Sequence, residues 1–327
     1  MKAFEWTDPA SLADALGQLG PASVAKAGGV DLMDLLKEHL VAPSRLVNIR
    51  RLPGLDRIED RGAAGLHVGP LVTLARLAED RTVGARWRAL AEAAGHAATP
   101  QIRNMATVGG NLVQKPRCWY YRLEQFPCLR KGGKECFARD GENAYHAVFA
   151  NEACCAVHPS SLATPLLAFG ASLELSSPRG ARTVPLENFL VPARELRTRD
   201  TMLDADELIT AIVLPAPGAG ATSAYVKQAQ KESYDWPLVE VAVAVDRGPS
   251  GACTRASVML GAVAPNPWKA RAAEAALVGR PLDEASARDA GKAAVQGATP
   301  LRDNGYKLAL IEAAVRRAVV AAGEGGR

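Results

Sequence analysis

One stretch decides how this chain folds: Ala106-Thr107-Val108-Gly109-Gly110-Asn111. The paired glycines let the backbone approach another molecule closely, because they carry no side chain. Five of the six cysteines in the chain lie between this turn and His158: Cys118, Cys128, Cys136, Cys154 and Cys155. The turn suits contact with a phosphate or a ring edge, and the cysteines suit a metal or a disulfide. Together the two features favour a flavin beside an iron–sulfur centre.

A second glycine element lies nearer the N-terminus, in Lys26-Ala27-Gly28-Gly29-Val30-Asp31-Leu32. The apolar pair Val24-Ala25 precedes it as the end of a strand, and apolar residues recur at helical spacing after it. A helix is therefore expected to begin near Asp31. A strand, a Gly-Gly turn and a helix N-terminus together form a geometry that binds pyrophosphate. Alone the signal is weak, because most Gly-Gly pairs after strands are simple turns and this one matches neither GxGxxG nor a P-loop.

The size and charge of the chain limit its class. At 327 residues, two or three domains are expected. A net charge of +4 is too small to indicate a nucleic-acid partner, and no apolar run approaches a membrane span. The N-terminal segment shows no signal peptide, which predicts a cytoplasmic location by default. Co-export with a signal-bearing partner subunit would instead place the chain in the periplasm.

The cysteine spacing favours some metals over others. Six cysteines in so long a chain do not form a small disulfide scaffold, and without CxxC pairs a zinc ribbon is disfavoured. Four cysteines spread over a loop can hold a [4Fe–4S] cluster, although zinc, a disulfide or scattered buried thiols stay open. Cys154 and Cys155 are adjacent, so only one of them is expected to bind the cluster. Cys253 lies in an alternating run and is expected in a strand.

The pattern of apolar residues predicts three parts, residues 1–55, 56–216 and 217–327, with a cysteine-rich loop over 114–157 inside the second. The first is expected to hold helices over 11–19 and 31–37 and strands over 24–27 and 46–48. Paired strands are expected over 171–175 and 182–185, and another over 207–214. The Pro- and Gly-rich run 215–220 marks the last boundary. Beyond it we expect strands over 223–228, 239–245 and 256–263, and helices over 269–277, 282–294 and 304–320.

Three segments carry a resemblance to a known family: Ala27-Gly28-Gly29-x-Asp31-Leu32, the run from Ile102 to Asn111, and His158-Pro159-Ser160-Ser161-Leu162-Ala163. They resemble, in order and spacing, the flavin motifs of the FAD-binding medium subunits of molybdenum hydroxylases, the xanthine dehydrogenase and CO dehydrogenase family. Tyr225-x-Lys227, Leu260–Ala264 and Pro267–Ala270 are similar to its C-terminal domain. The resemblance implies an α+β chain with an α/β N-terminal part: a PCMH-type FAD-binding fold in two subdomains, then a C-terminal α+β domain with a three-stranded antiparallel sheet and helices.

The cysteine loop narrows this resemblance. It is similar to the [4Fe–4S]-bearing FAD subunit of bacterial aldehyde oxidoreductases of the periplasmic type and, second, to the beta subunit of 4-hydroxybenzoyl-CoA reductase. A xanthine dehydrogenase-like enzyme is a further alternative. The resemblance implies that the cluster ligands are Cys118, Cys128, Cys136 and Cys154, since the offset of Cys154 from His158 fits the family. Cys155 would then be a neighbour.

The resemblance also implies which residues bind FAD. The first motif would wrap the pyrophosphate, Thr107 and Asn111 would donate or accept side-chain hydrogen bonds, and Lys227 would lie near the flavin ring. Ser161 stands where the family usually has an aspartate, which puts the contact there in doubt. The implied residues are Lys26, Ala27, Gly28, Gly29, Val30, Asp31, Leu32, Met33, Ala97, Thr107, Val108, Gly109, Gly110, Asn111, Ser161, Ile209 and Lys227.

The implied function is electron transfer, with no catalytic residue in this chain. Two partner subunits are implied: a large one with the molybdopterin cofactor and a small one with two [2Fe–2S] clusters. Electrons would pass between these clusters and an external acceptor through FAD. Two other classes stay open: a free-standing flavoprotein oxidoreductase and a zinc-stapled nucleotide-binding module.

Two groups of side chains beside the cysteines have more than one interpretation. The basic residues are expected either to form a solvated loop surface, or to neutralise a cluster and dock a partner. His146 and His158 flank the cysteines and could hydrogen-bond to sulfur, although His158 is more simply structural. The basic residues are Lys115, Arg117, Arg122, Arg130, Lys131 and Lys134.

Overall fold

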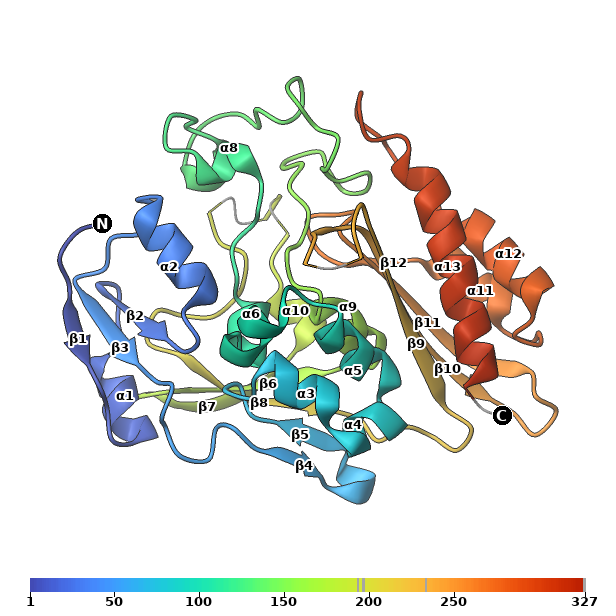
Figure 1. The fold of residues 1–327 in the computed structure, drawn as a ribbon, viewed down its shortest axis with the longest axis horizontal. Coiled ribbons are helices and arrows are strands. Elements are labelled where there is room, and N and C mark those ends of the chain that lie inside the picture. The colour runs from blue at the N-terminus through green and yellow to red at the C-terminus, as the bar shows by residue number, and fades with distance from the viewer. Residues whose placement is uncertain (193, 196–197, 233, 326–327) are drawn as a thin grey trace.

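A computed structural model describes residues 1–192, 194–195, 198–232 and 234–325. Its strands form three β-sheets that follow one another along the chain, and helices pack against each sheet. Figure 1 shows the N-terminal unit on one side, the C-terminal unit on the other, and the cysteine loop above both. The predicted α+β architecture, with two N-terminal parts and a C-terminal domain, is confirmed.

The N-terminal unit is a small parallel sheet in the order β1-β3-β2. Leu46 and Val47 on its central strand are fully buried, and Ser11 caps the first helix by accepting from the Asp14 backbone N–H. The two predicted helices and two predicted strands are present, and β1 is an additional strand. The elements are β1 (Glu5–Thr7), α1 (Leu12–Gln18), β2 (Ser23–Lys26), α2 (Val30–Lys37) and β3 (Arg45–Asn48).

The second unit is an antiparallel sheet in the order β4-β5-β8-β6-β7. Strand β8 comes late in the chain but pairs between β5 and β6, so it joins the segments before and after the cysteine loop. Trp87, Leu66 and Leu173 are fully buried in its core. The strands are β4 (Ile58–Asp60), β5 (Leu66–Val68), β6 (Ser172–Ser177), β7 (Gly180–Pro185) and β8 (Leu208–Leu214).

The helices of the second unit are short and gather above its sheet (Figure 1). Thr73, Asp80, Thr99 and Thr107 each cap one of them through a side-chain oxygen. The helices are α3 (Leu74–Glu79), α4 (Arg81–Arg86), α5 (Arg88–Gly95), α6 (Pro100–Met105), α7 (Val108–Leu112), α9 (Ala163–Ala168), α10 (Leu186–Phe189) and the 3-10 turn η1 (Gly62–Ala64).

The C-terminal unit is an antiparallel sheet in the order β12-β11-β10-β9, flanked by three helices. The prediction of three strands is wrong, because β12 (Trp268–Lys269) pairs with β11 where a helix was expected to begin. Two residues are too few to show an alternation that a sequence pattern could reveal. The other elements are β9 (Thr222–Ala229), β10 (Pro237–Arg247), β11 (Cys253–Gly261), α11 (Arg271–Leu277), α12 (Glu284–Ala294) and α13 (Lys307–Glu324).

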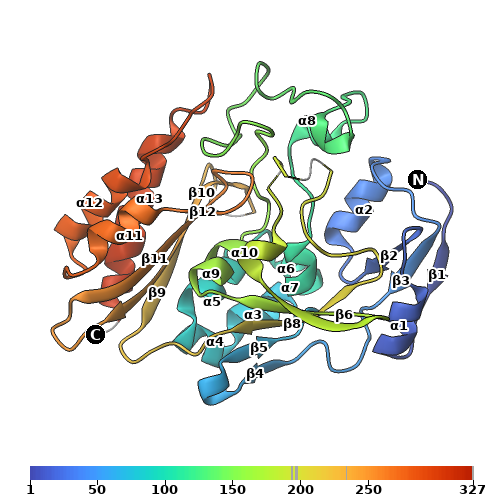
Figure 2. The same ribbon diagram turned by 180° about the vertical axis from the view of Figure 1, so that it is seen from behind.

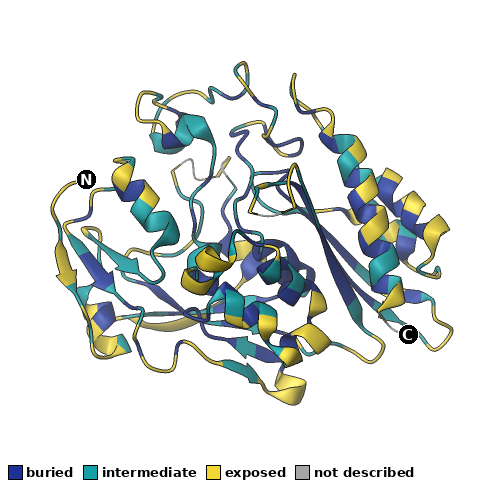
Figure 3. Cartoon of the chain, viewed as in Figure 1, coloured by how far each residue is buried: buried dark blue, intermediate teal, exposed yellow. Residues whose placement is uncertain are grey.

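The C-terminal sheet has helices along both of its faces (Figure 2), and Figure 3 shows most of its strand β10 as buried. On one face its side chains pack against α11, α12 and α13. On the other face Tyr225, Ala242, Ala244 and Met259 belong to the core of the second unit, which includes α5 and α9. The two units therefore share apolar side chains across their junction.

The cysteine loop contains only two short helical turns, α8 (Trp119–Arg122) and η2 (Leu129–Lys131). Its far end is fixed to the C-terminal unit, where the ring of Phe149 stacks on Trp268 with centroids 4.8 Å apart and Val148 N donates to Val263 O at 2.8 Å. Among the described residues, no helix combines the length and the apolar character needed to cross a membrane.

Candidate functional site

The two glycine motifs meet in space. Gly28 lies so close to the end of α6 that a Cβ at this position would be 2.0 Å from the carbonyl oxygen of Met105. Gly29 caps α2 in a left-handed conformation, with φ of 79°. The first backbone N–H groups of a helix have no partner within the helix. This junction therefore joins a helix N-terminus to the segment that leads into the second motif.

The second motif forms the start of α7, with both of its polar side chains engaged inside the protein. Thr107 Oγ1 accepts from Gly110 N at 3.2 Å, and Asn111 Oδ1 accepts from Ser160 Oγ at 2.7 Å. Gly109 packs on Pro70, so that an added Cβ would lie 2.8 Å from the Pro70 Cβ. Asn111 thus holds the His158–Ala163 segment against the second motif. A role of Thr107 and Asn111 toward FAD stays a prediction.

The remaining predicted flavin residues lie at the junction of the second and C-terminal units or in the core. Ala97 follows α5 and is buried, and its carbonyl accepts from Arg103 at 2.8 Å. Lys227 on β9 donates to His96 O at 3.0 Å and to Asp235 O at 2.6 Å. Ser161 Oγ donates to the carboxylate of Glu240. Ile209 lies on β8 within the core of the second unit.

The first turn of α2 consists of the predicted flavin residues Val30, Asp31, Leu32 and Met33. Asp31 turns toward the cysteine loop. Its carboxylate accepts from Lys115 N at 2.8 Å and pairs with Arg117 at 2.9 Å and with Arg122 at 2.8 Å. Asp31 therefore anchors the start of the cysteine loop to α2, a role that the sequence did not indicate.

The thiols of the cysteine loop converge although they are spread over 38 positions. Cys118 packs with Cys154 beside Leu129, and Cys155 N donates to Cys136 Sγ at 3.5 Å. Hydrogen bonds from the Cys154 and Cys155 thiols lower the pKa of Cys136 to about 2. Cys136 and Cys128 also act electrostatically on Cys118, whose pKa burial raises to about 12. Cys253 lies apart in β11, as expected.

Both Cys154 and Cys155 interact with the thiol of Cys136, although the two residues are adjacent in the chain. Cys155 is fully buried, and its Sγ also lies 3.6 Å from Asn151 O. Which of the two is the fourth ligand stays a prediction. Within the described ranges, no three His, Cys, Asp or Glu side chains are arranged to hold a single metal ion.

Most basic side chains of the loop are neither a free solvated surface nor directed only at the cysteines. Lys115 and Arg130 both pair with Asp200, the first at 2.7 Å. Arg122 also pairs with Glu38 at 3.2 Å. These ion pairs fix the loop to α2 on one side and to the segment before β8 on the other. Arg130 still acts electrostatically on Cys154 and Cys128, as expected for a cation beside thiolates.

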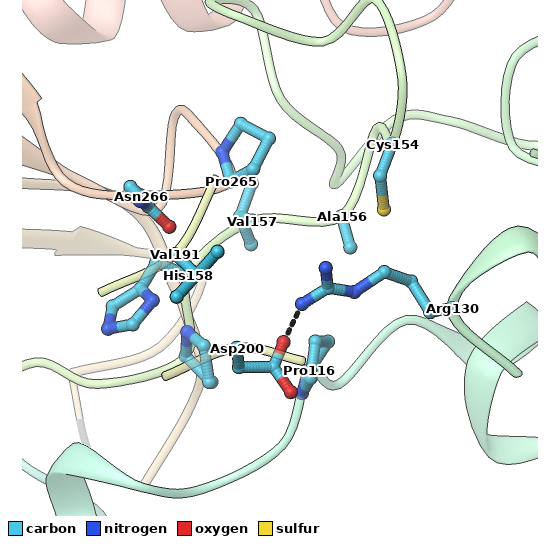
Figure 4. A pocket seen from close by; sticks show the side chains of 11 residues that line it. Pro116, Arg130, Cys154, Ala156, Val157, His158, Val191, Asp200, Pro265 and Asn266 are labelled. Atoms are coloured by element: carbon cyan, nitrogen blue, oxygen red, sulfur yellow. Dashed lines mark ion pairs between the residues drawn. The ribbon is translucent and has the colours of Figure 1, made fainter. Parts of the chain in front are cut away.

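The two histidines differ in their contacts. His146 Nε2 lies 3.2 Å from Cys118 Sγ, which matches the expected hydrogen bond to sulfur. Its ring packs edge-on against Trp119, with centroids 5.0 Å apart, and this aromatic contact covers the Cys118 side of the group. His158 lines a pocket with Cys154, Arg130 and Asp200, shown in Figure 4, and burial lowers its pKa to about 4.

Glu240 lies at the junction of the second and C-terminal units, and no sequence motif indicated it. Its carboxylate is buried and accepts from Ser161, from Tyr225 OH at 2.7 Å and from Thr164 Oγ1 at 3.4 Å. It stands in an otherwise apolar strand, Val239–Val245, where a lone charged residue is the only available signal.

Comparisons with known proteins agree with this arrangement. A family profile described as "FAD binding domain in molybdopterin dehydrogenase" matches residues 2–217, and one described as "CO dehydrogenase flavoprotein C-terminal domain" matches residues 224–322. The chain is 36% identical to the aldehyde oxidoreductase FAD-binding subunit PaoB of Escherichia coli K12, over 85% of this chain and 86% of the relative. It is 28% identical to the carbon monoxide dehydrogenase medium chain of Hydrogenophaga pseudoflava, over 98% and 96% of the two chains.

Solved structures show the same likeness. Carbon monoxide dehydrogenase from Hydrogenophaga pseudoflava, in a form lacking the Mo-pyranopterin moiety, superposes with a TM-score of 0.76 at 30% identity, covering 99% of this chain and 98% of that one. Quinoline 2-oxidoreductase from Pseudomonas putida 86 superposes with a TM-score of 0.75 at 27% identity, covering 100% and 99%.

Proposed function

Because the chain belongs to the FAD-binding medium subunits of the molybdenum hydroxylases, the xanthine dehydrogenase and CO dehydrogenase family, we propose that it carries a [4Fe–4S] cluster beside FAD as the electron-transfer subunit of an aldehyde oxidoreductase. The convergence of five thiols in a loop whose start is bound by Asp31 of the first flavin motif is the observation that carries this proposal.

The glycine junction fits FAD. Gly28 brings the α2 N-terminus against Met105, and the dipole of α2, an eight-residue helix, favours a diphosphate there. Lys26 lies beside this turn, with its Cε 3.0 Å from the Cβ that Gly29 lacks, and adds a positive charge. Bound FAD exchanges one electron at a time with iron–sulfur clusters and two with a soluble acceptor.

The cysteine group fits a cubane cluster better than a single ion. Each thiolate would bind a different iron atom of the cluster, so the four ligands need not surround one point as the ligands of a single ion do. Hydrogen bonds between their sulfur atoms bring the thiols of Cys136, Cys154 and Cys155 together, and Arg130 lies where it would offset part of the negative charge of a thiolate-bound cluster. His146, 3.2 Å from Cys118 Sγ, would hydrogen-bond a ligand sulfur and tune the potential.

The proposed complex is a heterotrimer. A large subunit would carry the molybdopterin cofactor and perform the chemistry on the substrate, and a small subunit would carry two [2Fe–2S] clusters. This chain would pass electrons between those clusters and an external acceptor. Support comes from the relatives, two of which are named medium chains of carbon monoxide dehydrogenase.

An aldehyde oxidoreductase is preferred among these enzymes. The FAD subunit of the Escherichia coli aldehyde oxidoreductase is 36% identical, whereas the xanthine dehydrogenase FAD subunits are 27–28% identical. A 4-hydroxybenzoyl-CoA reductase-like complex is the alternative that the cysteine loop also suits. Co-purification with the neighbouring gene products, followed by assays with aldehydes and with an aromatic CoA thioester, separates the two.

Serine variants of individual cysteines test the cluster ligands. We expect Cys128→Ser to lose most of the iron while keeping FAD, and Cys253→Ser, a buried strand residue, to keep both. Comparing Cys154→Ser with Cys155→Ser identifies the fourth ligand, and Cys154 is expected to be the one whose loss removes iron. Iron retained in Cys128→Ser, or lost equally in Cys253→Ser, would contradict the assignment.

A further inference from the structure

Glu240 is a buried carboxylate that the proposed electron transfer does not use. It lies on β10, where its partners across the sheet are Lys227 on β9 and Gly261 on β11. A Cβ on Gly261 would lie 2.5 Å from Glu240 Oε2 and 2.4 Å from Thr164 Oγ1. The missing side chain at Gly261 therefore leaves the space that the carboxylate occupies.

Three hydroxyl groups from two different elements converge on this carboxylate. Ser161 and Tyr225 donate to Oε1, and Thr164 donates to Oε2 at 3.4 Å. Ser161 and Thr164 belong to the segment that begins α9, whereas Tyr225 lies on β9. Burial raises the pKa of Glu240, and the three hydroxyl bonds together with the charge of Lys227 work against that rise. An ionised carboxylate accepts all three bonds at once, and such charge-assisted bonds are about twice as strong as neutral ones. Glu240 thus joins the second unit to the C-terminal sheet.

The same network holds the residues expected at the flavin. Lys227 donates to His96 O at 3.0 Å, and the His96 ring stacks on Tyr225 with centroids 6.3 Å apart. Ala97 follows His96 directly. Ser161 contacts Glu240 itself. Of the three candidate flavin contacts, Ser161 is therefore bonded to the carboxylate, Lys227 lies opposite it on the neighbouring strand, and Ala97 is linked to it only through His96 and Tyr225.

We propose that Glu240 is a positioning residue of the flavin site: its carboxylate holds Ser161 and the Tyr225–Lys227 stretch in place and supplies a fixed negative charge that opposes flavin reduction. This inference rests on the proposed FAD function. It also gives a physical reason for serine at position 161, because an aspartate there would share one buried site with Glu240, and two carboxylates at close range repel.

Four variants of the full chain test the proposal, with FAD dissociation constant and flavin midpoint potential as the readouts. Glu240→Gln removes the charge and should weaken FAD binding about tenfold, the effect of losing one charge-assisted contact, and raise the midpoint potential. Ser161→Asp should weaken FAD binding by a similar factor, because it adds a second carboxylate. The double variant Ser161→Asp/Glu240→Ser should recover most of the affinity, because one carboxylate again occupies the site.

Glu274→Gln is the matched control. This half-buried glutamate also lies in the C-terminal unit, but it accepts from Val258 N on the helix-covered side of the sheet at 3.1 Å. It should leave both readouts at wild-type values. If Glu240→Gln binds FAD with unchanged affinity and potential, or if the double variant binds no better than Ser161→Asp, Glu240 is not a positioning residue. A wild-type chain that binds no FAD would instead refute the proposed function, and the inference with it.

Discussion

Gly28 is the residue at which the first glycine motif contacts the segment that leads into the second. The need for a glycine in a strand–turn–helix element could be predicted from the sequence, because the turn is local. Its contact with Met105, 77 positions later in the chain, could not, because no periodic pattern links the two segments. The role of Glu240 could not be predicted for the same reason, because its partners Ser161 and Thr164 lie 79 and 76 positions away in the chain.

Replacing Gly28 with alanine should disrupt the junction. The added Cβ would lie 2.0 Å from a backbone oxygen, so either α6 or the α2 N-terminus must shift, at a cost of about 3 kcal/mol in unfolding free energy. FAD content should fall with it. Gly17→Ala is the control, since nothing lies within 4 Å and alanine in a helix should stabilise by about 1 kcal/mol. Normal FAD content in Gly28→Ala, measured by absorbance, would show that the junction tolerates the shift.

His158 should make stability depend on acid pH. Its ordinary pKa is 6.5 and burial lowers the value in the folded chain to about 4. Between these values the unfolded chain binds more protons than the folded one, so the free energy of unfolding falls as pH drops from about 6.5 to 4. The loss from this group should be about 3 kcal/mol. Urea unfolding at several pH values should give a flatter profile for His158→Gln, and parallel profiles would contradict this.

At the scale of elements, ion pairs with Asp31 and Asp200 hold the cysteine loop against the rest of the chain. The sequence indicated a cysteine-rich loop over 114–157, because cysteines and glycines are distinctive residue types, whereas its four cluster ligands stay a prediction that rests on the family resemblance. It did not predict that Asp31 and Asp200 would hold the basic residues, because ion pairs between distant segments leave no local pattern. Strand β12 was not predicted for the same reason: only its pairing with the distant strand β11 defines it, and such pairing leaves no local pattern in the sequence.

Removing the charge of Asp31 should release the start of the loop. Asp31→Asn loses the ion pairs with Arg117 and Arg122, at a cost of about 2 kcal/mol. Arg122 then keeps only Glu38, at 3.2 Å, and Arg117 keeps only Asp34, at 3.7 Å, as ion-pair partners among those described. We expect faster trypsin cleavage after the exposed Lys134 and lower iron content. Asp34→Asn is the control, because its carboxylate is half exposed and lies 3.7 Å from Arg117. Equal cleavage rates in the two variants would mean that other contacts hold the loop.

At the scale of the whole molecule, the second unit and the C-terminal sheet share a core. Tyr225, Ala242, Ala244 and Met259 pack into the helices of the second unit, with Glu240 among them. The sequence separated these parts at residues 215–220 from Pro and Gly content alone. It could not show that the sheet is buried on both faces, although the long apolar run Val239–Val245 is consistent with that.

The shared core predicts joint unfolding. Calorimetry should give one transition for the second and C-terminal units, with calorimetric and van't Hoff enthalpies in agreement. Ala244→Asp would place an unpaired charge in this core and should lower the melting temperature of both units together. Two separate transitions, of which only one responds to Ala244→Asp, would mean that the junction does not couple the units.

The most direct test of the account is the iron, acid-labile sulfide, zinc and flavin content of the anaerobically purified chain, alone and with its partner subunits. The account predicts one FAD and about four irons with as many sulfides per chain, the content of a single cubane cluster. FAD without iron would reduce the cysteine loop to a structural element of an ordinary medium subunit. Zinc in place of iron, without flavin, would contradict the central claim.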